Sequence, residues 1–483
     1  MTGAATFVLP ADGARRLRAA AASRGELGLV HHRPDDVYVV TKFRDGPAGA
    51  LLPVSILRSQ ELLRQTEAFA YVGEWQRADL QAQIHHYMLG RRPGRCISGD
   101  DLVRLVPGLR KPRSQERLLV VVHCPEAAEL EPASPLQEFT GWDVTAEQAV
   151  PVDLVVEPDV HGLDQLKGHW PVEVLRGRSV LVVGTGSLGS AAAAALAGYG
   201  VGGLGRLDPD RLLWHNTVRH VLDDADIGRH KVDALADRLR ARWPGLQAVP
   251  LRLDVVAHAD VVRALLPGHD AVVCAADGIA PRRVVSHLAR RAGVDAVLTS
   301  VLEDGAIGEV LRLRRAPDQG CLLCRRAVLF EDGRMDPERV HERGYGDGDP
   351  HRPMTAVGPD LSLVGQLAAK VTVAGLLERA GHPDQRLPGE HAVVGLRPRG
   401  RYGAPFDVDR AGEVRWHLAT PPQPGCVTAP TRDQDRHAHS LGAQHHPVGL
   451  PRRATRTRDR RDPARPRVPQ RWSDSDHRRR SRS

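Results

Sequence analysis

The sequence has no uninterrupted run of 18 apolar residues, and its first residues do not form a basic segment followed by an apolar one. A bilayer-spanning helix needs about 20 consecutive apolar residues, and a secretory leader needs a charged region before an apolar one. These absences exclude both elements at the level of sequence. We therefore expect a soluble, cytoplasmic protein with no membrane partner.

Cysteine is scarce, with 6 residues in a chain of 483. A disulfide framework needs a much higher density of cysteine in a short chain. Metal binding, catalysis and plain burial are the explanations that remain for these thiols. A chain of this length is expected to form about two to four domains, each large enough for a hydrophobic core.

Lysine is rarer still, with 5 residues against 62 arginines, and the formal charge of +8 is concentrated at one end. Residues 431–483 carry 15 Arg and 6 Asp, a net charge of +9, so the rest of the chain sums to −1. This tail has no hydrophobic period, which predicts disorder, with a shifted reading frame as the alternative. Binding of nucleic acid through phosphate contacts is disfavoured, because Trp472 is the only aromatic residue there that could stack on a base.

A glycine-rich turn near the middle of the chain is its most informative stretch. Ser179–Val183 is a short apolar, β-branched run typical of a buried parallel strand. Gly184, Gly186 and Gly189 follow as GxGxxG and lead into an alanine-rich helix, an arrangement that binds phosphate at a helix N-terminus. Asp208 ends the next short strand, at the spacing that lets an acid reach a ribose hydroxyl. This fingerprint predicts nucleotide binding and by itself fits an NAD or FAD oxidoreductase equally well.

Further polar positions separate these alternatives. In chain order they are Asp208, Asp210, Asn216, Arg219, His220, Lys231 and Asp277. Their order and spacing, from Val183 to about residue 280, resemble the ThiF/MoeB/HesA family of the ubiquitin-activating enzyme superfamily. The pattern of that family is GxGxxG, DxD, N-x-x-R-Q, G-x-x-K and an aspartate that ends a later strand. His220 stands where the family usually has glutamine. An oxidoreductase has no use for these later positions in hydride transfer.

The resemblance implies a Rossmann-like α/β domain over 171–430 that uses ATP and Mg²⁺ to adenylate a carboxylate. It assigns the phosphates to Gly184, Gly186, Gly189, Asn216 and Arg219, the ribose to Asp208, the departing pyrophosphate to Lys231, and Mg²⁺ to Asp277. Arg219, Lys231 and Asp277 are thus the implied catalytic residues, while His215 and His220 are interpreted as structural. The implied acceptor is the C-terminal carboxylate of a ubiquitin-like protein or peptide, and the implied assembly is a homodimer.

The cysteines near the end of this domain resemble an incomplete version of the family's zinc site. Cys321 and Cys324 form its first CxxC, but of the second pair only Cys426 is present, with Ala429 at the fourth position. A structural zinc ion takes four ligands, so zinc held by three cysteines and a nearby histidine competes with plain burial of thiols. No cysteine lies between Cys324 and Cys426, which predicts that no thioester forms on this domain and that the adenylate passes to a partner.

Residues 1–125 are predicted to form a smaller α/β domain, and 126–170 a linker rich in proline and acidic residues. Helices are expected over Gly13–Ala22 and Ser55–Thr66. Strands are expected over Val37–Val40, Phe69–Val72 and Leu118–Val122.

This first domain resembles the JAB (JAMM/MPN) metalloprotease fold in three details: Glu26 after the first helix, the run FAYVGEW, and Ser98 three residues before Asp101. Gln76 and Ala78, however, occupy the positions of the family's two zinc-binding histidines. We therefore expect a JAB-like domain without metal, and an unrelated α/β module is the alternative. For the whole chain, a non-catalytic, partner-binding scaffold of the same fold is the alternative to an adenylating enzyme.

Overall fold

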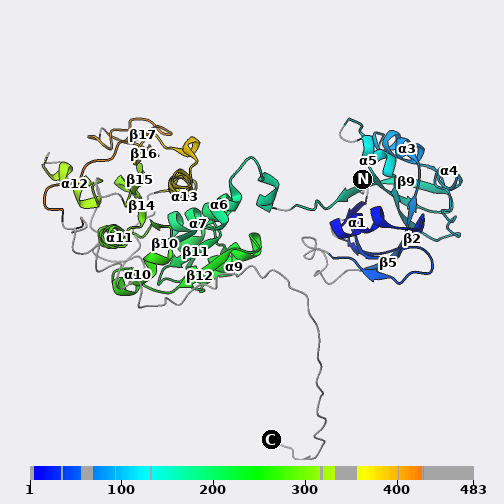
Figure 1. Cartoon of the computed structure of the whole chain (residues 1–483), viewed down its shortest axis with the longest axis horizontal. Coiled ribbons are helices and arrows are strands. Elements are labelled where there is room, and N and C mark those ends of the chain that lie inside the picture. The colour runs from blue at the N-terminus through cyan, green and yellow to red at the C-terminus, as the bar shows by residue number, and fades with distance from the viewer. Residues whose placement is uncertain are drawn as a thin grey trace, which may run out of the picture. The chain divides into compact units, whose positions relative to one another are not determined.

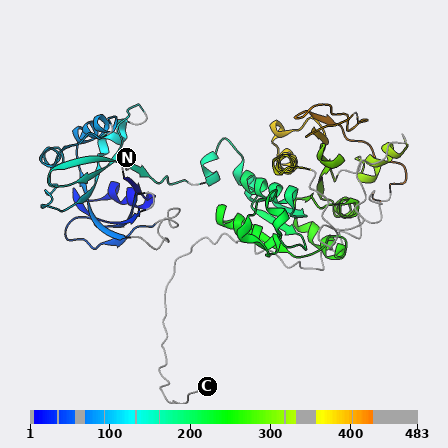
Figure 2. The ribbon, with the colours of Figure 1, turned by 180° about the vertical axis from the view of Figure 1, so that it is seen from behind.

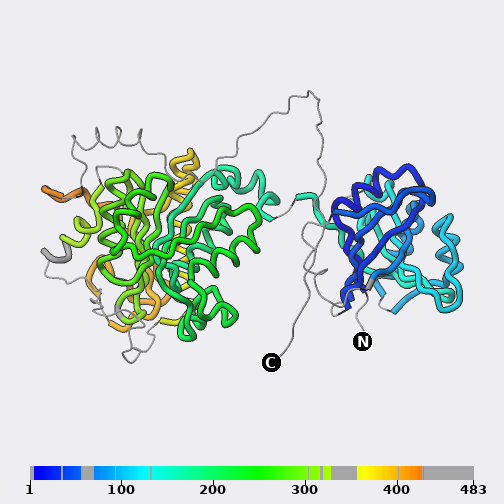
Figure 3. Tube along the Cα trace, turned by 90° about the horizontal axis from the view of Figure 1, so that it is seen from below, coloured from blue at the N-terminus to red at the C-terminus, as the bar shows by residue number. Residues whose placement is uncertain are grey.

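The computed structural model describes residues 5–426 and Thr428, apart from 34–35, 56–68, 93, 131–132, 161, 316–318, 332–355 and 401. The chain divides into two compact units, Met1–Trp170 and Pro171–Ser483 (Figure 1; Figure 3). The helix predicted over Ser55–Thr66 and the tail over 431–483 fall outside the described residues.

The N-terminal unit is built on one mixed sheet. Its strands are β1 (Thr6–Leu9), β2 (Arg24–His32), β3 (Val37–Phe43), β4 (Leu52–Pro53), β5 (Phe69–Arg77), β6 (Ile97–Ser98), β7 (Leu118–His123), β8 (Phe139–Val144) and β9 (Gln148–Val156). They are ordered β1-β3-β2-β5-β7-β8-β9-β6, with β4 on β3. Because β1 pairs in parallel with both β3 and β9, the sheet closes on itself. Closure removes the free edges that an open sheet would present.

Helices lie against this sheet (Figure 2). The buried side chains of the unit form two separate hydrophobic clusters. The helices are α1 (Ala11–Ala19), α3 (Leu80–Gly90), α4 (Gly99–Leu105) and α5 (Pro125–Leu130). Leu17 of α1 is buried with Phe7, Leu29 and Trp75, whereas Leu102 of α4 belongs to the second cluster. The strands predicted over Val37–Val40, Phe69–Val72 and Leu118–Val122 lie within β3, β5 and β7, and a helix is present at the first predicted position. Alternate residues of β7 belong to the two clusters, so each face of the sheet has its own apolar core.

The linker predicted over 126–170 is wrong for residues 139–156, which form β8 and β9. Trp142 of β8 is fully buried, and β9 bonds to both β8 and β1. The prolines and acids that suggested a linker lie mainly before and after these strands. Composition averaged over the whole stretch thus concealed two short strands that close the sheet.

The residues behind the JAB resemblance make local structural contacts. Glu26 on β2 pairs with Arg44, and Nε2 of Gln76 donates to the carbonyl of Gly108. Ser98 is the N-cap of α4, where its Oγ accepts the backbone N–H of Asp101. The resemblance, and the absence of metal that goes with it, stay predictions.

The C-terminal unit is a Rossmann-like sheet extended by antiparallel strands. Its strands are β10 (Ser179–Val183), β11 (Gly203–Leu207), β12 (Gln247–Leu251), β13 (Ala271–Cys274), β14 (Asp295–Leu302), β15 (Ile307–Leu313), β16 (His391–Gly395) and β17 (Val414–His417). The order is β12-β11-β10-β13-β14-β15-β16-β17. The first five run parallel, and β15 to β17 are each antiparallel to the strand before them. The predicted α/β fold class is confirmed for this domain.

Helices cover both faces of this sheet. They are α6 (Val172–Arg176), α7 (Ser187–Tyr199), α8 (Trp214–Thr217), α9 (Lys231–Arg242), α10 (Ala259–Leu265), α11 (Ile279–Ala292), α12 (Leu322–Glu331) and α13 (Gly358–Arg379). α7 packs against α13 and α9, and α10 and α11 share a core with the other face. Among the described helices α13 alone is long and apolar enough to span a bilayer, but 67% of its apolar window is buried, as in the core helix of a folded domain.

The closed sheet predicts which truncated forms of the N-terminal unit can fold. A fragment of residues 1–170 should unfold cooperatively in urea, because it keeps every strand pairing of the sheet. A fragment of 1–138 lacks β8 and β9, so β1 keeps only β3, β7 keeps only β5, the sheet cannot close, and the fragment should not fold. Circular dichroism with urea titration measures this, and cooperative unfolding of the shorter fragment would contradict the described pairing.

Candidate functional site

The glycine turn lies where β10 meets the end of β13. A Cβ on Gly184, whose φ is +80°, would lie 2.6 Å from Cα of Ala276, and one on Gly189 would lie 1.8 Å from the carbonyl oxygen of Gly184. Packing alone therefore requires glycine at both positions. A Cβ on Gly186 would meet nothing within 4 Å. Because Gly186 has no side chain, the space at the N-terminus of α7 is open, and a phosphate group could approach the backbone there.

Asp208 follows β11 and is only 5% exposed. Its Oδ2 accepts the backbone N–H of Thr185 at 2.6 Å and its Oδ1 that of Asp210 at 2.9 Å. Burial raises the pKa of Asp208, against the opposing pull of the Lys231 charge and of these two N–H groups. Asp208 thus ties the glycine turn to the next strand, a function that the sequence pattern did not reveal. Its assignment to the ribose stays a prediction.

Lys231 begins α9 and points its ammonium group at the same region. Only 7% of the residue is exposed, and its Nζ donates to Oδ2 of Asp210 at 2.9 Å. The backbone N–H of Lys231 also donates to the carbonyl of Asp210. A buried lysine held by one flexible, largely exposed carboxylate can exchange that partner for a phosphate group. The DxD pattern thus supplies the partner of Lys231, which the sequence analysis did not assign.

Asn216 and Arg219 lie in and just after the short helix α8. Oδ1 of Asn216 accepts the backbone N–H of Leu213 and so shapes this turn. A Cβ on Gly358 would come within 3.2 Å of Cα of Arg219, which places the start of α13 against α8. The structure gives Asn216 a local structural contact, and the predicted phosphate contacts of both residues stay predictions.

His220 is partly buried beside the glycine turn. Its Nε2 lies 2.6 Å from the carbonyl oxygen of Thr185, and its Nδ1 accepts the backbone N–H of Leu222 at 3.1 Å. Burial lowers the pKa of His220 to about 4. A neutral ring with both nitrogens bonded to backbone agrees with its interpretation as a structural residue rather than an acid–base group.

Asp277 is exposed and follows Ala276, the residue against which Gly184 packs. Parallel strands end at a common edge of the sheet, so the glycine turn after β10 and Asp277 after β13 lie together. Magnesium prefers carboxylate and phosphate oxygens. The accessible carboxylate of Asp277 beside the open backbone of Gly186 fits such an ion together with a polyphosphate.

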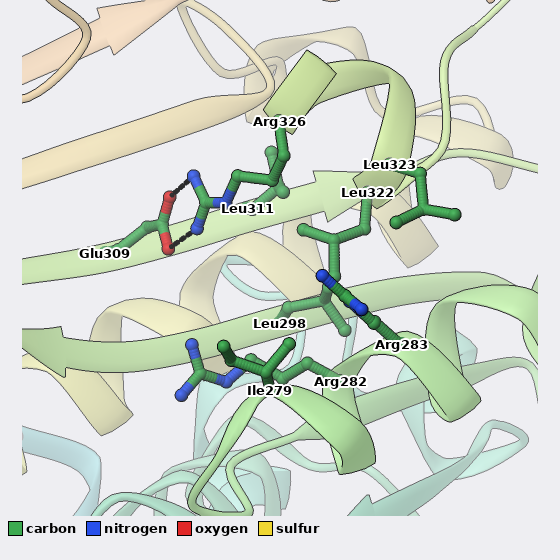
Figure 4. Close-up of a pocket in the computed structure, with 9 residues that line it drawn as sticks. All are labelled: Ile279, Arg282, Arg283, Leu298, Glu309, Leu311, Leu322, Leu323 and Arg326. Carbon is green, nitrogen blue, oxygen red and sulfur yellow. Dashed lines mark hydrogen bonds and ion pairs between the residues drawn. The ribbon is translucent and has the colours of Figure 1, made fainter. Parts of the chain in front are cut away.

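A small pocket adjoins this edge (Figure 4). It is lined by Ile279, Arg282, Arg283, Leu298, Glu309, Leu311, Leu322, Leu323 and Arg326. The leucines of β14 and β15 form an apolar floor, and arginines of α11 and α12 stand around it. The pocket therefore combines apolar and positively charged groups close to where α11 starts, two residues after Asp277.

Glu309 and Arg326 form a buried ion pair in the wall of this pocket, visible as two dashed bonds in Figure 4. Nε2 of His391 lies 2.9 Å from the same carboxylate. Burial would raise the pKa of Glu309, but the Arg326 charge and His391 hold it well below its usual range. The sequence analysis did not find this pair, because its members are 17 residues apart and belong to no motif.

The three predicted cysteine ligands come together. Sγ of Cys321 lies 3.7 Å from Sγ of Cys324 and 3.6 Å from Sγ of Cys426. Two thiolates on one tetrahedral zinc ion, with Zn–S bonds of about 2.3 Å, lie about 3.8 Å apart. Oγ1 of Thr428 lies 3.3 Å from Sγ of Cys426. Among the described residues this is the one group of three or more ligands that could hold a metal ion.

A comparison with protein-family models matches residues 162–389 to the ThiF family. The chain is 44% identical over 79 residues to "Adenylyltransferase and sulfurtransferase uba4" of Aspergillus clavatus, a match that covers 16% of each protein. It is 44% identical over 85 residues to "Molybdopterin-synthase adenylyltransferase" of Salmonella typhimurium, covering 17% of this chain and 34% of that one. It is 31% identical over 127 residues to "Ubiquitin-like modifier-activating enzyme ATG7" of Candida albicans, covering 23% and 18%.

Among solved structures, Escherichia coli MccB covers 54% of this chain and 67% of its own, at 16% identity and a TM-score of 0.40. The curated relatives are matched over 16–34% of their length. The predicted resemblance is therefore confirmed for the nucleotide-binding part of the chain. The match to the ThiF family spans residues 162–389, the part of the chain that holds the glycine turn, Lys231 and Asp277.

Proposed function

We propose that the protein binds ATP with Mg²⁺ and adenylates the C-terminal carboxylate of a ubiquitin-like protein or peptide. One observation carries the proposal: the open backbone at Gly186, the buried Lys231 and the exposed Asp277 all lie at one edge of a Rossmann-like sheet in a ThiF family domain. The adenylyltransferase names of two partial relatives support the reaction type.

The reaction needs positioning and charge stabilisation more than it needs a base. A carboxylate oxygen of the acceptor attacks the α-phosphorus of ATP, the bond to the β-phosphate oxygen breaks, and pyrophosphate leaves. The backbone at Gly186 would hold phosphate, and Lys231 would leave Asp210 to neutralise the leaving group. Arg219 would lie over the phosphates, and Asp277 would hold Mg²⁺, which supplies further positive charge when bound.

The adenylate is proposed to pass to a separate partner. Between Cys324 and Cys426 the sequence has no cysteine that could take the acyl group as a thioester. Cys321 and Cys324 are buried and lie in the three-thiol group, so they are not available as carriers. The product of this domain is therefore a free or partner-bound acyl-adenylate.

Asp277→Asn should lower pyrophosphate–ATP exchange about 100-fold or more, because the amide cannot replace the carboxylate charge on the ion. Exchange would be measured with a panel of ubiquitin-like proteins and peptides that end in glycine. Asp384→Asn, an exposed site in a distant turn, is the matched control. Undiminished exchange in Asp277→Asn would remove this residue from the mechanism, and no exchange by the native protein with any acceptor would favour the scaffold alternative.

We propose further that Cys321, Cys324 and Cys426 hold one zinc ion that fastens α12 to the segment around Cys426. The Sγ separations of 3.6 and 3.7 Å support three thiolates on one ion. Such a link closes a loop of about one hundred residues, so the bound metal should stabilise the domain.

The purified chain should contain one zinc per molecule. Cys324→Ser and Cys426→Ser should each lose that zinc and unfold at a lower temperature. Cys96→Ser, at an exposed site in the N-terminal unit, should keep the full metal content. Elemental analysis after gel filtration measures all four proteins, and native zinc content in Cys426→Ser would contradict the three-thiol site.

A homodimer is proposed from an exposed apolar patch beside the site. Trp214 at the start of α8 and Val218 just after its end are 73% and 66% exposed, and Val357 just before α13 is 57% exposed. The backbone of Gly358 packs against the carbonyl of Val218, which makes the patch continuous. Exposed aromatic and apolar side chains of this size mark interaction surfaces.

Trp214→Glu should convert the dimer to a monomer in sedimentation equilibrium at micromolar concentration, because it puts a charge at the centre of the patch. Val256→Glu, at an exposed apolar position elsewhere in the domain, should leave the association unchanged. A native protein that is monomeric under these conditions, or a dimer unaffected by Trp214→Glu, would contradict the proposal.

A further inference from the structure

Thr185, in the middle of the glycine turn, is held at both of its backbone groups. Its N–H donates to Oδ2 of Asp208 at 2.6 Å, and its carbonyl oxygen lies 2.6 Å from Nε2 of His220. The first bond comes from the first aspartate of the DxD pattern, just after β11, and the second from the segment after α8. The peptide groups on either side of Thr185 are therefore fixed from two elements that are distant in sequence.

The two bonds of His220 determine where its proton lies. Nδ1 accepts the backbone N–H of Leu222, so Nδ1 carries no proton. The proton of the neutral ring is then on Nε2, which donates it to the carbonyl of Thr185. A doubly protonated ring would present an N–H to the N–H of Leu222 and would lose that bond.

The surroundings of the ring keep it neutral. Burial lowers the pKa of His220 to about 4, and the positive charges of Lys231 and Arg219 act in the same direction. The charge of Asp226 and the bond to Thr185 act in the opposite direction. The ring is therefore neutral over the whole pH range in which a cytoplasmic enzyme works.

We propose that His220 is a positioning residue that holds the phosphate-binding turn in its competent shape through the carbonyl of Thr185. It touches neither substrate nor phosphate. Fixing the Thr185 carbonyl orients the next peptide group, and with it the open backbone at Gly186 and the N-terminus of α7. This inference rests on the proposed binding of ATP, because a preformed turn spares the ligand the free energy of ordering it.

Glutamine can reproduce both bonds of this histidine. Its amide offers one N–H donor and one carbonyl acceptor at the end of a side chain of similar length. Leucine fills similar space with neither group, and it would leave the Thr185 carbonyl and the Leu222 N–H without their partners. The pair His220→Gln and His220→Leu therefore separates hydrogen bonding from packing.

The test is the dissociation constant of MgATP, measured by calorimetry on the full chain at pH 7.5. His220→Gln should bind within about threefold of the native protein, and His220→Leu about tenfold more weakly, as expected for one or two lost hydrogen bonds. His287→Gln, on α11, is the control for a histidine substitution outside the site. Equal affinity in the leucine variant, or a glutamine variant as weak as leucine, would overturn the inference.

If the native protein binds no ATP, that result contradicts the proposed function and leaves the bonds of His220 undecided. A second measurement then tests the inference. In nitrogen-15 spectra of histidine-labelled protein, the resonances lost in His220→Gln should show a proton on Nε2 and none on Nδ1, unchanged from pH 8 to pH 5. A ring that titrates near 6.5, or that carries its proton on Nδ1, would overturn the inference.

The lowered pKa of His220 also predicts that the stability of the folded protein depends on pH. Between pH 6.5 and about 4 the unfolded chain takes up a proton at position 220 that the folded chain does not, so stability falls as pH falls. His220→Gln removes this loss, and its melting temperature should decline less than that of the native protein from pH 6.5 to 4.5. Parallel declines in the two proteins would contradict a neutral, buried His220.

Discussion

The contact between Gly184 and the backbone of Ala276 is the constraint on which the site depends. It brings the ends of β10 and β13 so close that no side chain fits between them. The glycine turn and Asp277 are thereby held at one sheet edge, and the chain between them must supply the remaining groups. Asp208 and His220 then fix Thr185 from either side, while Asp210 holds the buried end of Lys231. The proposed phosphate site is thus constrained in its backbone at Thr185 and Gly184 and open at Gly186.

Much of this domain could be predicted because its features are local in sequence. The strand before Gly184 and the alanine-rich helix after it each follow from a short pattern, and Asp208 follows from a fixed spacing. The three cysteines could be named as a group because CxxC is a local pattern and Cys426 was the only candidate near the end of the domain. What the sequence did not reveal are pairings between distant residues, such as Glu309 with Arg326 or Asp208 with the backbone of Thr185. Such pairings depend on which faces of the helices and strands pack together, and the spacing of residues in the sequence does not reveal this.

The N-terminal unit shows the same limit in another form. Its strands were predicted where apolar residues are dense, as in Leu118–Val122, and missed in β8 and β9, where proline, glycine and acidic residues interrupt the pattern. Trp142 of β8 is fully buried, and β9 pairs with β1, which lies more than one hundred residues earlier. Long-range pairing of this kind overrides local composition. Of the residues behind the JAB resemblance, Ser98 caps a helix, and Glu26 and Gln76 bond to nearby side chains and backbone.

The most direct test of the central claim is competitive equilibrium binding of ATP and NAD to the native chain in the presence of Mg²⁺. A phosphate turn followed by Lys231 and Asp277 predicts one ATP bound per chain, with an affinity that falls when Mg²⁺ is removed, and no comparable binding of NAD. Tight binding of NAD with no binding of ATP would contradict the assignment of this site to adenylation.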